Sequence, residues 1–176
     1  MNMEIKLRKL FAADIDEEYC NWYSNDDRHL QYFTGSGRTF SRNMIIDDFE
    51  AGEQSGTHCY YVIEMVGGTR IGNVKIGPID KRNRTSDLVC LIGNRSFVGK
   101  GIAGHAISLA NHIAFETHDI RRLHGGMHAH NISSIKAYVR SGWFIEGTMR
   151  GYYLIDNVSV DRVCVACLNP KYFPTT

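Results

Sequence analysis

The chain has 176 residues, and its 20 lysines and arginines against 19 aspartates and glutamates give a formal charge of +1. That length suits one domain with a buried core, and a near-neutral chain without a basic run favours neither nucleic acid nor an anionic membrane as a partner. No apolar stretch approaches the ~20 residues of a membrane span, and the start alternates like a strand, unlike a signal peptide.

Hydrophobic periodicity predicts an α/β order of elements within a single domain that spans residues 1–176. Ser41 is placed to cap a helix, because apolar residues follow it at helical spacing. Gly67-Gly68 indicates a hairpin turn between two strand-like runs. In chain order the expected elements are a strand at Ile5–Leu10, a helix at Asp14–Asn25, a helix from Ser41 to Gly52, strands at Cys59–Met65, Arg70–Ile79 and Asp87–Ile92, a long helix at Ile102–Phe115, a strand at Arg122–Ala129, a short helix at Ser133–Ser141 and two closing strands.

The five cysteines form an odd set, and two of them, Cys164 and Cys167, lie in an alternating apolar run. This pattern favours reduced core thiols over metal or redox chemistry, and with them a cytoplasmic protein. The eight histidines have no metal-binding spacing, so no metal site is expected.

The segment from Asp87 to Ala106 carries the strongest local indication of function. An apolar strand leads into a glycine-rich loop, Val98-Gly99-Lys100-Gly101-Ile102-Ala103-Gly104, which opens into the long helix. Glycine lets the backbone turn tightly and lets an anion approach the unpaired N–H groups at the helix start. Those groups, the helix dipole and Lys100 suit a pyrophosphate. The loop has neither the dinucleotide fingerprint nor the P-loop spacing, and alone it could be a plain strand-to-helix turn.

A second motif follows the long helix. Residues 131–143 read Asn-Ile-Ser-Ser-Ile-Lys-Ala-Tyr-Val-Arg-Ser-Gly-Trp. Together with the glycine loop, this pattern resembles the GNAT superfamily of acetyl-CoA-dependent N-acetyltransferases, and more finely its branch of ribosomal-protein and amino-sugar acetyltransferases. The resemblance runs from the strand at Ile5 to the last strand near Leu168.

The resemblance implies a GNAT fold, in which about four helices flank a mixed sheet of six or seven strands that is splayed in its middle. It also implies acetyl-CoA as cosubstrate. The pantetheine arm would pair with the strand at Leu91, Ile92 and Gly93, and Asn131 and Ser134 would contact CoA. Asn131 is equally suited to cap the short helix. Tyr138 matches the tyrosine that protonates or orients the sulfur, its alternative being a core aromatic. The loop departs from the family at Val98, where Gln or Arg is usual.

The general base has three candidates: Asp87, His128 and His130. Asp87 falls where related enzymes often carry a carboxylate on the strand before the loop, and burial would raise its pKa toward that task. A solvated strand end is the other reading of Asp87. His128 titrates near neutral pH and competes for the role, although a partly exposed, hydrogen-bonded histidine is the ordinary alternative.

The acceptor would be a small-molecule amine bound by Trp22, Tyr32, Arg38, Arg150 and Tyr152. Aromatic faces and cations suit a sugar ring with a nucleotide diphosphate. The resemblance of Gly125 through Asp161 to the amino-sugar branch implies acetylation of a nucleotide-linked amino sugar. An acidic groove would favour basic peptides or polyamines instead, and the run from Asp14 to Glu18 is the one hint of it, although a solvated first turn explains that run.

Two other functions stay open at this level. The chain could acetylate protein N-termini, as the ribosomal branch does, or it could be a non-catalytic acyl-CoA-binding module that senses acetyl-CoA. Relatives are often dimers, and no sequence feature decides between a monomer and a homodimer.

Overall fold

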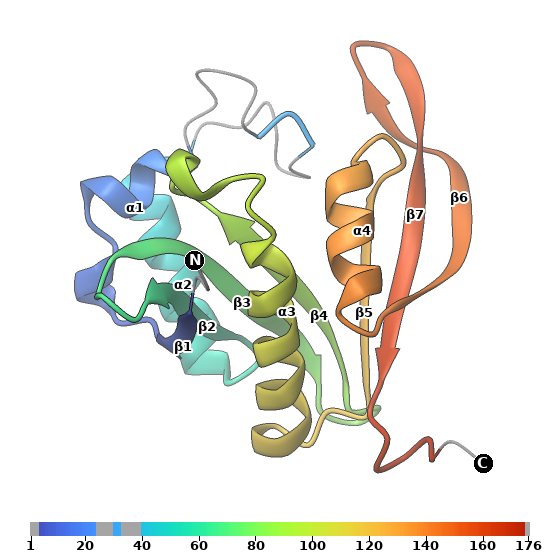
Figure 1. Ribbon diagram of the computed structural model, residues 1–176, viewed down its shortest axis with the longest axis horizontal. Helices are drawn as coiled ribbons and strands as arrows, with labels where there is room; N and C mark the ends of the chain where they lie inside the picture. The colour runs from blue at the N-terminus through green and yellow to red at the C-terminus, as the bar shows by residue number, and fades with distance from the viewer. Residues whose placement is uncertain (1–3, 24–29, 33–39, 175–176) are drawn as a thin grey trace.

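A computed structural model describes residues 4–23, 30–32 and 40–174 of the chain. Seven strands form one mixed sheet in the order β1-β2-β3-β4-β5-β7-β6 (Figure 1). Within it β4 and β5 run parallel, and the other neighbouring pairs are antiparallel. The strands are β1 Ile5–Lys9, β2 Cys59–Met65, β3 Arg70–Asp80, β4 Thr85–Ile92, β5 Arg122–His128, β6 Phe144–Ile155 and β7 Val158–Leu168.

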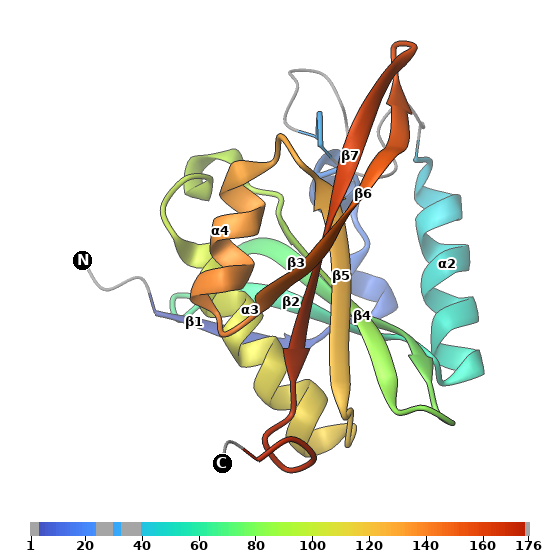
Figure 2. The same ribbon diagram turned by 90° about the vertical axis from the view of Figure 1, so that its right-hand side faces the viewer.

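Four α-helices lie on the two faces of this sheet (Figure 2). One face carries α3 and α4, and the other carries α1 and α2. The predicted fold, a mixed sheet of about six or seven strands flanked by about four helices, is confirmed. The described residues form seven strands and four α-helices. The helices are α1 Glu17–Asn21, α2 Arg42–Ser55, α3 Ile102–His112 and α4 Ile132–Arg140, with 3-10 turns η1 Ala12–Asp14 and η2 Arg95–Phe97 and a π-helical turn η3 Ile113–Thr117 after α3.

The main hydrophobic core lies between the sheet and the pair α3 and α4. Helix α3 presents Ile102, Ala106 and Ala110 to the sheet at helical spacing, and all three are buried. A second, smaller core joins α1 and α2 to the other face, around Ile15 and Val62. Helices therefore cover both faces of the sheet. The place where two neighbouring strands separate is the opening that the fold leaves within the sheet itself.

That separation occurs between β4 and β5. The two strands pair from Thr85 with Arg122 to Asp87 with His124, and pairing ends there. Beyond this fork, β4 stays paired with β3, and β5 pairs with β7. Figure 1 shows that α3 and α4 both begin at the open end of the gap. The backbone edges of two strands and two helix N-termini therefore meet in one place.

The first helix is shorter than predicted. The sequence predicts a helix at Asp14–Asn25, whereas Ala12–Asp14 form a 3-10 turn and α1 covers Glu17–Asn21. The cause is local, because the side chain of Asp16 accepts a hydrogen bond from the Tyr19 N–H and so starts a new helix. Along the described residues, no helix is both long and apolar enough to cross a membrane.

Candidate active site at the fork of the sheet

The glycine loop ends at the first turn of α3. Gly101 is the N-cap of this helix with φ of +79°, and Gly99 has φ of +77°, both in the left-handed region that favours glycine. No side chain caps the helix, and a Cβ built on either glycine would meet nothing within 4 Å. Unpaired N–H groups therefore face open space at a helix start, which fits the pyrophosphate of acetyl-CoA.

The remaining loop residues divide into exposed and packed positions. Val98 and Lys100 are exposed, and the Lys100 ammonium lies 5.3 Å from the Phe97 ring centroid. Gly104 lies against α4, where the Ser141 hydroxyl donates a hydrogen bond to its carbonyl at 2.9 Å. Ile102 is buried and Ala103 half-buried, so they contribute backbone rather than side chain to the site.

The backbone groups of β4 divide between the gap and β3. The Tyr138 hydroxyl, which lies on the β5 side of β4, donates to the Leu88 carbonyl, so the polar groups of Leu88 face the gap. Because these groups alternate sides along a strand, Cys90 and Ile92 share that edge and Leu91 faces β3. The Gly93 N–H donates to the Ile71 carbonyl on β3 at 2.9 Å. The backbone groups of Cys90 and Ile92 therefore face the gap, and the pairing of a pantetheine arm along Leu91, Ile92 and Gly93 stays a prediction.

Tyr138 on α4 is buried at 5% exposure, and its ring packs against Trp143 with centroids 4.8 Å apart. Its hydroxyl donates to the Leu88 carbonyl at 2.7 Å, just past the last paired residue of β4. Burial raises the pKa of Tyr138 well above its usual value, so the hydroxyl keeps its proton. Tyr138 is therefore a core aromatic whose hydroxyl lies at the gap, and its role toward the sulfur stays a prediction.

Asp87 is the last residue of β4 that pairs with β5. Its Oδ1 accepts a hydrogen bond from the Leu88 N–H at 2.7 Å, and a Cβ built on Gly125 would lie 3.6 Å from the same oxygen. Burial raises the pKa of Asp87, although His124, Arg162 and the Leu88 N–H act against that shift. The solvated strand end considered from sequence is wrong, because the carboxyl group sits at the fork.

His128 lies at the far end of β5 and is only 3% exposed. The partly exposed, hydrogen-bonded histidine considered from sequence is therefore wrong, because burial also leaves its Nδ1 without a partner. The ring packs against that of Tyr153 at a tilt of 39°, with centroids 4.2 Å apart, and desolvation lowers the pKa of His128. The fork lies four residues back along the strand at His124, so the structure places Asp87, and not His128, beside the Tyr138 hydroxyl.

Asn131 caps α4, as its alternative reading predicts. Its side-chain oxygen accepts a hydrogen bond from the Ser134 N–H at 3.2 Å. Both residues lie at the helix start that Figure 1 shows at the open end of the gap. Their contact with CoA stays a prediction.

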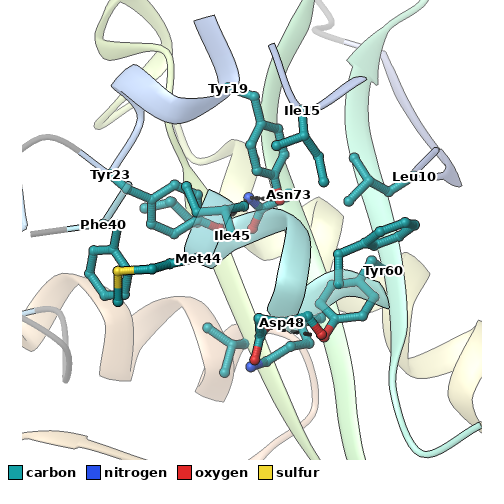
Figure 3. Close-up of a pocket in the computed structure, with 14 residues that line it drawn as sticks. Leu10, Ile15, Tyr19, Tyr23, Phe40, Met44, Ile45, Asp48, Tyr60 and Asn73 are labelled. Carbon is teal, nitrogen blue, oxygen red and sulfur yellow. Dashed lines mark hydrogen bonds between the residues drawn. The ribbon is translucent and has the colours of Figure 1, made fainter. Parts of the chain in front are cut away.

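A cavity of about 360 Å³ lies on the α2 side of the sheet, next to β4 (Figure 3). Its wall is largely apolar, and five of its fourteen lining residues are tyrosines or phenylalanines from α1, α2, β2 and the segments next to α1 and α2. The Asn73 amide donates to the Tyr19 and Tyr23 hydroxyls at 3.0 and 2.7 Å. Asp48 accepts from the Tyr60 hydroxyl at 3.2 Å, and Lys75 also lines the cavity. The positive charge of Lys75 also acts to lower the pKa of Asp87, so this cavity adjoins the fork of the sheet.

The five predicted acceptor contacts fall in different places. Trp22 is buried at 4% and packs on Gly93, where a Cβ would come within 2.1 Å of the indole, so it supports the end of β4. Tyr32 lies with its ring 6.1 Å from that of His128. Arg150 is exposed on β6, and Tyr152 is half-exposed on the same strand. Arg38 lies outside the described residues.

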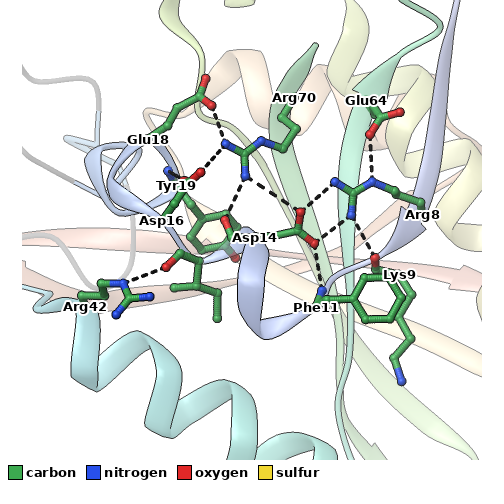
Figure 4. Close-up of polar contacts among 11 residues, drawn as sticks. Arg8, Lys9, Phe11, Asp14, Asp16, Glu18, Tyr19, Arg42, Glu64 and Arg70 are labelled. Atoms are coloured by element: carbon green, nitrogen blue, oxygen red, sulfur yellow. Dashed lines mark hydrogen bonds and ion pairs between the residues drawn. The ribbon is translucent and has the colours of Figure 1, made fainter. Parts of the chain in front are cut away.

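Part of the acidic run after β1 forms ion pairs (Figure 4), and Glu17 and Glu18 also line an open groove beside Trp22 and Gly93. Asp14 accepts two hydrogen bonds of 2.8 Å from Arg8, which lower its pKa. Arg70 donates to Asp16 at 2.7 Å and to Glu18 at 2.6 Å. These ion pairs tie the first turns to β1 and β3 through Asp14, Asp16 and Glu18. Glu17 is exposed and forms none of the ion pairs found among the described residues.

Sequence reasoning missed Arg162 on β7. Its Nε and Cζ lie where a side chain on Gly126 would be, 1.8 and 2.5 Å from a Cβ built there. A glycine at position 126 leaves room for a long side chain from a neighbouring strand. The sequence does not show that β5 pairs with β7, so it could not connect Gly126 with Arg162. Among the described residues, no group of three or more metal-ligating side chains comes together.

Comparisons with known proteins agree with this geometry. A family model described as an acetyltransferase (GNAT) domain matches residues 4–143. The chain resembles a spermidine N-acetyltransferase from Vibrio cholerae in complex with CoA and spermine, with a TM-score of 0.84 and 19% identity over 96% of this chain and 98% of that one. A dodecameric structure of spermidine N-acetyltransferase from the same organism gives a TM-score of 0.79 and 19% identity over 97% and 96%. No curated protein matches the chain in sequence.

Proposed function

This chain belongs to the GNAT acetyltransferase family, and from that premise we propose that it acetylates the primary amine of a nucleotide-linked amino sugar. Membership makes it an N-acetyltransferase that uses acetyl-CoA, which supplies an acetyl group activated as a thioester. The acceptor, and the residues that act on it, are the proposed part.

Asp87 is the proposed general base. An amine attacks only when it has lost its extra proton, and a carboxylate with a raised pKa accepts that proton more readily than an ordinary one. Asp87 also lies at the fork, where the gap between β4 and β5 begins. The proton would pass from the ammonium group to Asp87 directly or through one water molecule.

Tyr138 is proposed to orient the sulfur rather than to give up its proton fully. Its hydroxyl already points into the gap, toward the backbone of β4. A pKa well above 10 makes the phenol a poor acid toward a thiolate, whose own pKa is about 8.5. The role that fits this environment is a hydrogen bond from the protonated hydroxyl to the departing sulfur, for which the single O–H turns from the Leu88 carbonyl to the sulfur.

The observation that carries the choice of acceptor is the charge around Asp87. His124, Arg162 and Lys75 all act to lower its pKa, so the groups that face the base are basic. A polycationic acceptor would be repelled here, whereas one with an anionic group near its amine would be attracted. The aromatic wall of the adjoining cavity offers apolar faces of the kind that sugar rings contact.

Polyamine acetylation is the second candidate. It is favoured by Asp48, a carboxylate on the wall of the cavity, where an ammonium group could bind. The similar solved structures are spermidine N-acetyltransferases, but at 18–19% identity this likeness concerns the fold. Arg8 and Arg70 pair with Asp14, Asp16 and Glu18 of the acidic run and so reduce its charge, whereas Glu17 and Glu18 still line a groove beside Trp22.

The test is release of the CoA thiol from acetyl-CoA with four acceptor classes: nucleotide-linked 3- and 4-amino-deoxysugars, spermidine, and peptides with free N-termini. We expect the highest kcat/KM with one of the amino-sugar nucleotides. A higher value with spermidine or a peptide would replace the proposed acceptor. Tight acetyl-CoA binding with no turnover across the panel would favour the sensor function instead.

A further inference from the structure

The Arg162 side chain lies flat across β5 in the space left by Gly126. A Cβ on residue 126 would come within 2.5 Å of the guanidinium carbon of Arg162, so this position of the Arg162 side chain requires a glycine at residue 126. The face of the guanidinium lies 4.9 Å from the centre of the Tyr152 ring. Gly126 falls between His124 and His128 on the same face of β5, so the guanidinium lies in front of the gap.

Two buried polar atoms in this place have no hydrogen-bond partner. They are Nε of Arg162 and Nδ1 of His128, and no other buried side-chain nitrogen or oxygen of the described residues lacks a hydrogen-bond partner. His128 is 97% shielded, with Tyr153 against its ring and Tyr32 at its edge. The two residues are direct partners in the register of β5 and β7, so the two atoms belong to one site.

Such atoms normally find a partner, because a buried donor without an acceptor costs about 1–3 kcal/mol. Arg162 always carries its proton, so it needs an acceptor, and His128 can donate from Nδ1 in one tautomer. Asp87 interacts electrostatically with Arg162 but forms no ion pair with it among the described contacts. The described residues therefore leave both atoms available to an oxygen acceptor that these residues do not supply.

We propose that Arg162 and His128 form a subsite for an anionic oxygen group of the acceptor, a phosphate or a carboxylate, and so hold its amine at the fork. The inference rests on the proposed function and deepens it, because it names the part of the acceptor that is recognised. Guanidinium and imidazole N–H groups are well matched to such oxygens, and charge-assisted hydrogen bonds are stronger than neutral ones.

The spacing restricts the acceptor further. Asp87 pairs with His124, and Gly126 lies two residues beyond it, about 7 Å along the strand. An α-amino acid holds its amine and carboxylate on one carbon, closer together than this. A ring that carries an amine on one side and an anionic substituent on the other spans it. The subsite thus selects amino sugars with a phosphate or carboxylate over amino acids and over polyamines.

The experiment compares one amino sugar in three forms: nucleotide-linked, as a uronic acid glycoside, and as a neutral methyl glycoside. For the wild type we expect a higher kcat/KM with an anionic form, and which form is preferred tells phosphate from carboxylate. Arg162→Gln should reduce the ratio of anionic to neutral kcat/KM about tenfold or more, through the acceptor KM. The KM for acetyl-CoA should not change. Arg162→Lys, which keeps the charge, should retain part of the preference.

Arg122→Gln is the matched control, because it removes an arginine from the other end of β5, where it pairs with Glu146. It should leave the ratio unchanged. An equal loss with all three forms in Arg162→Gln would make Arg162 a structural residue and overturn the proposal.

A binding measurement separates this inference from the choice of acceptor. If the wild type turns over no amino sugar, the proposed function fails, and the subsite is then tested alone by calorimetry with inorganic pyrophosphate on protein saturated with CoA. Binding that disappears in Arg162→Gln supports the subsite. Equal binding to both proteins, or none to the wild type, refutes it.

Discussion

Burial raises the pKa of Asp87, so its ionised form costs free energy of folding that a neutral side chain would avoid. The proposed role of Asp87 as general base needs that ionised form, because a carboxylate accepts a proton and a neutral carboxylic acid does not. Stability and activity therefore make opposite demands on one residue. This opposition separates a catalytic carboxylate from a structural one.

Asp87→Asn should lower kcat by about 10²-fold or more while leaving the KM for acetyl-CoA unchanged. Its unfolding free energy at neutral pH should equal or exceed that of the wild type, because the raised pKa means that ionisation destabilises the fold above the ordinary carboxyl pKa. Steady-state kinetics and thermal unfolding measure the two effects. Asp80→Asn, at an exposed aspartate that bonds Asn83, is the control. A variant with both wild-type kcat and lowered stability would assign Asp87 to the scaffold.

The pH dependence follows from the same shift. Activity should fall on the acid side as Asp87 takes up its proton, at a pH above 3.8, the ordinary pKa of the group. The acid limb of log(kcat/KM) against pH reports this titration for the free enzyme. In Asp87→Asn that limb should be absent, and its persistence would point to another base.

Tyr138→Phe tests the second proposed residue. Removing the hydroxyl leaves the Leu88 carbonyl without its partner, which should cost about 1–3 kcal/mol of unfolding free energy. If the hydroxyl also orients the sulfur, kcat should fall further than this loss of stability explains at temperatures where the variant is folded. The affinity for CoA, measured by calorimetry, should stay near that of the wild type. Unchanged kcat in the folded variant would leave Tyr138 as a core residue.

At the level of elements, the loop before α3 combines two glycines with positive φ and a helix start without a side-chain cap. Gly101→Ala should strain this turn and raise the KM for acetyl-CoA, with the acceptor KM little changed, because an L side chain is disfavoured at φ of +79°. Gly67→Ala, in the turn between β2 and β3, has open space and no positive φ, so it should be silent. An equal rise in both KM values would detach the loop from CoA binding.

The elements were predictable to the degree that they rest on local pattern. β2 runs over the predicted Cys59–Met65, and Ser41 caps α2 through the Met44 N–H, because period-two alternation and capping are properties of short segments. The break between η1 and α1 was not predicted, because it depends on where the Asp16 side chain finds a donor. The sequence also could not show which backbone groups of β4 face the gap, because the register with β3 determines which of them are already paired.

The sequence predicts those site residues that belong to a local motif. It does not predict those that only strand pairing brings to the site. The loop from Val98 to Gly104 and Tyr138 stand out from the sequence alone, and both lie at the gap. Arg162 did not, because a cation on a late strand has no signal until β7 is known to pair with β5 beside Gly126. Trp22 was assigned to the acceptor because exposed and buried indoles look alike in sequence.

At the scale of the whole molecule, the edge strand β6 exposes apolar side chains, among them Ile145 at 54% and Leu154 at 70%. An uncovered edge of this kind is a template for association, and we expect a homodimer that covers it. Sedimentation at micromolar concentration should show a species of two chains, and Ile145→Lys should shift it toward one. A monomer at all concentrations would leave β6 as a free edge.

The most direct test of the account is a crystal structure of the protein with CoA and the amino-sugar nucleotide together. The account predicts the CoA pyrophosphate on the N–H groups of Gly99 to Gly101, the sulfur in the gap between β4 and β5 within hydrogen-bond reach of Tyr138, and the acceptor amine beside Asp87 on the α2 side. CoA bound away from that gap, or an acceptor amine that enters from the side of α3 and α4, would contradict it.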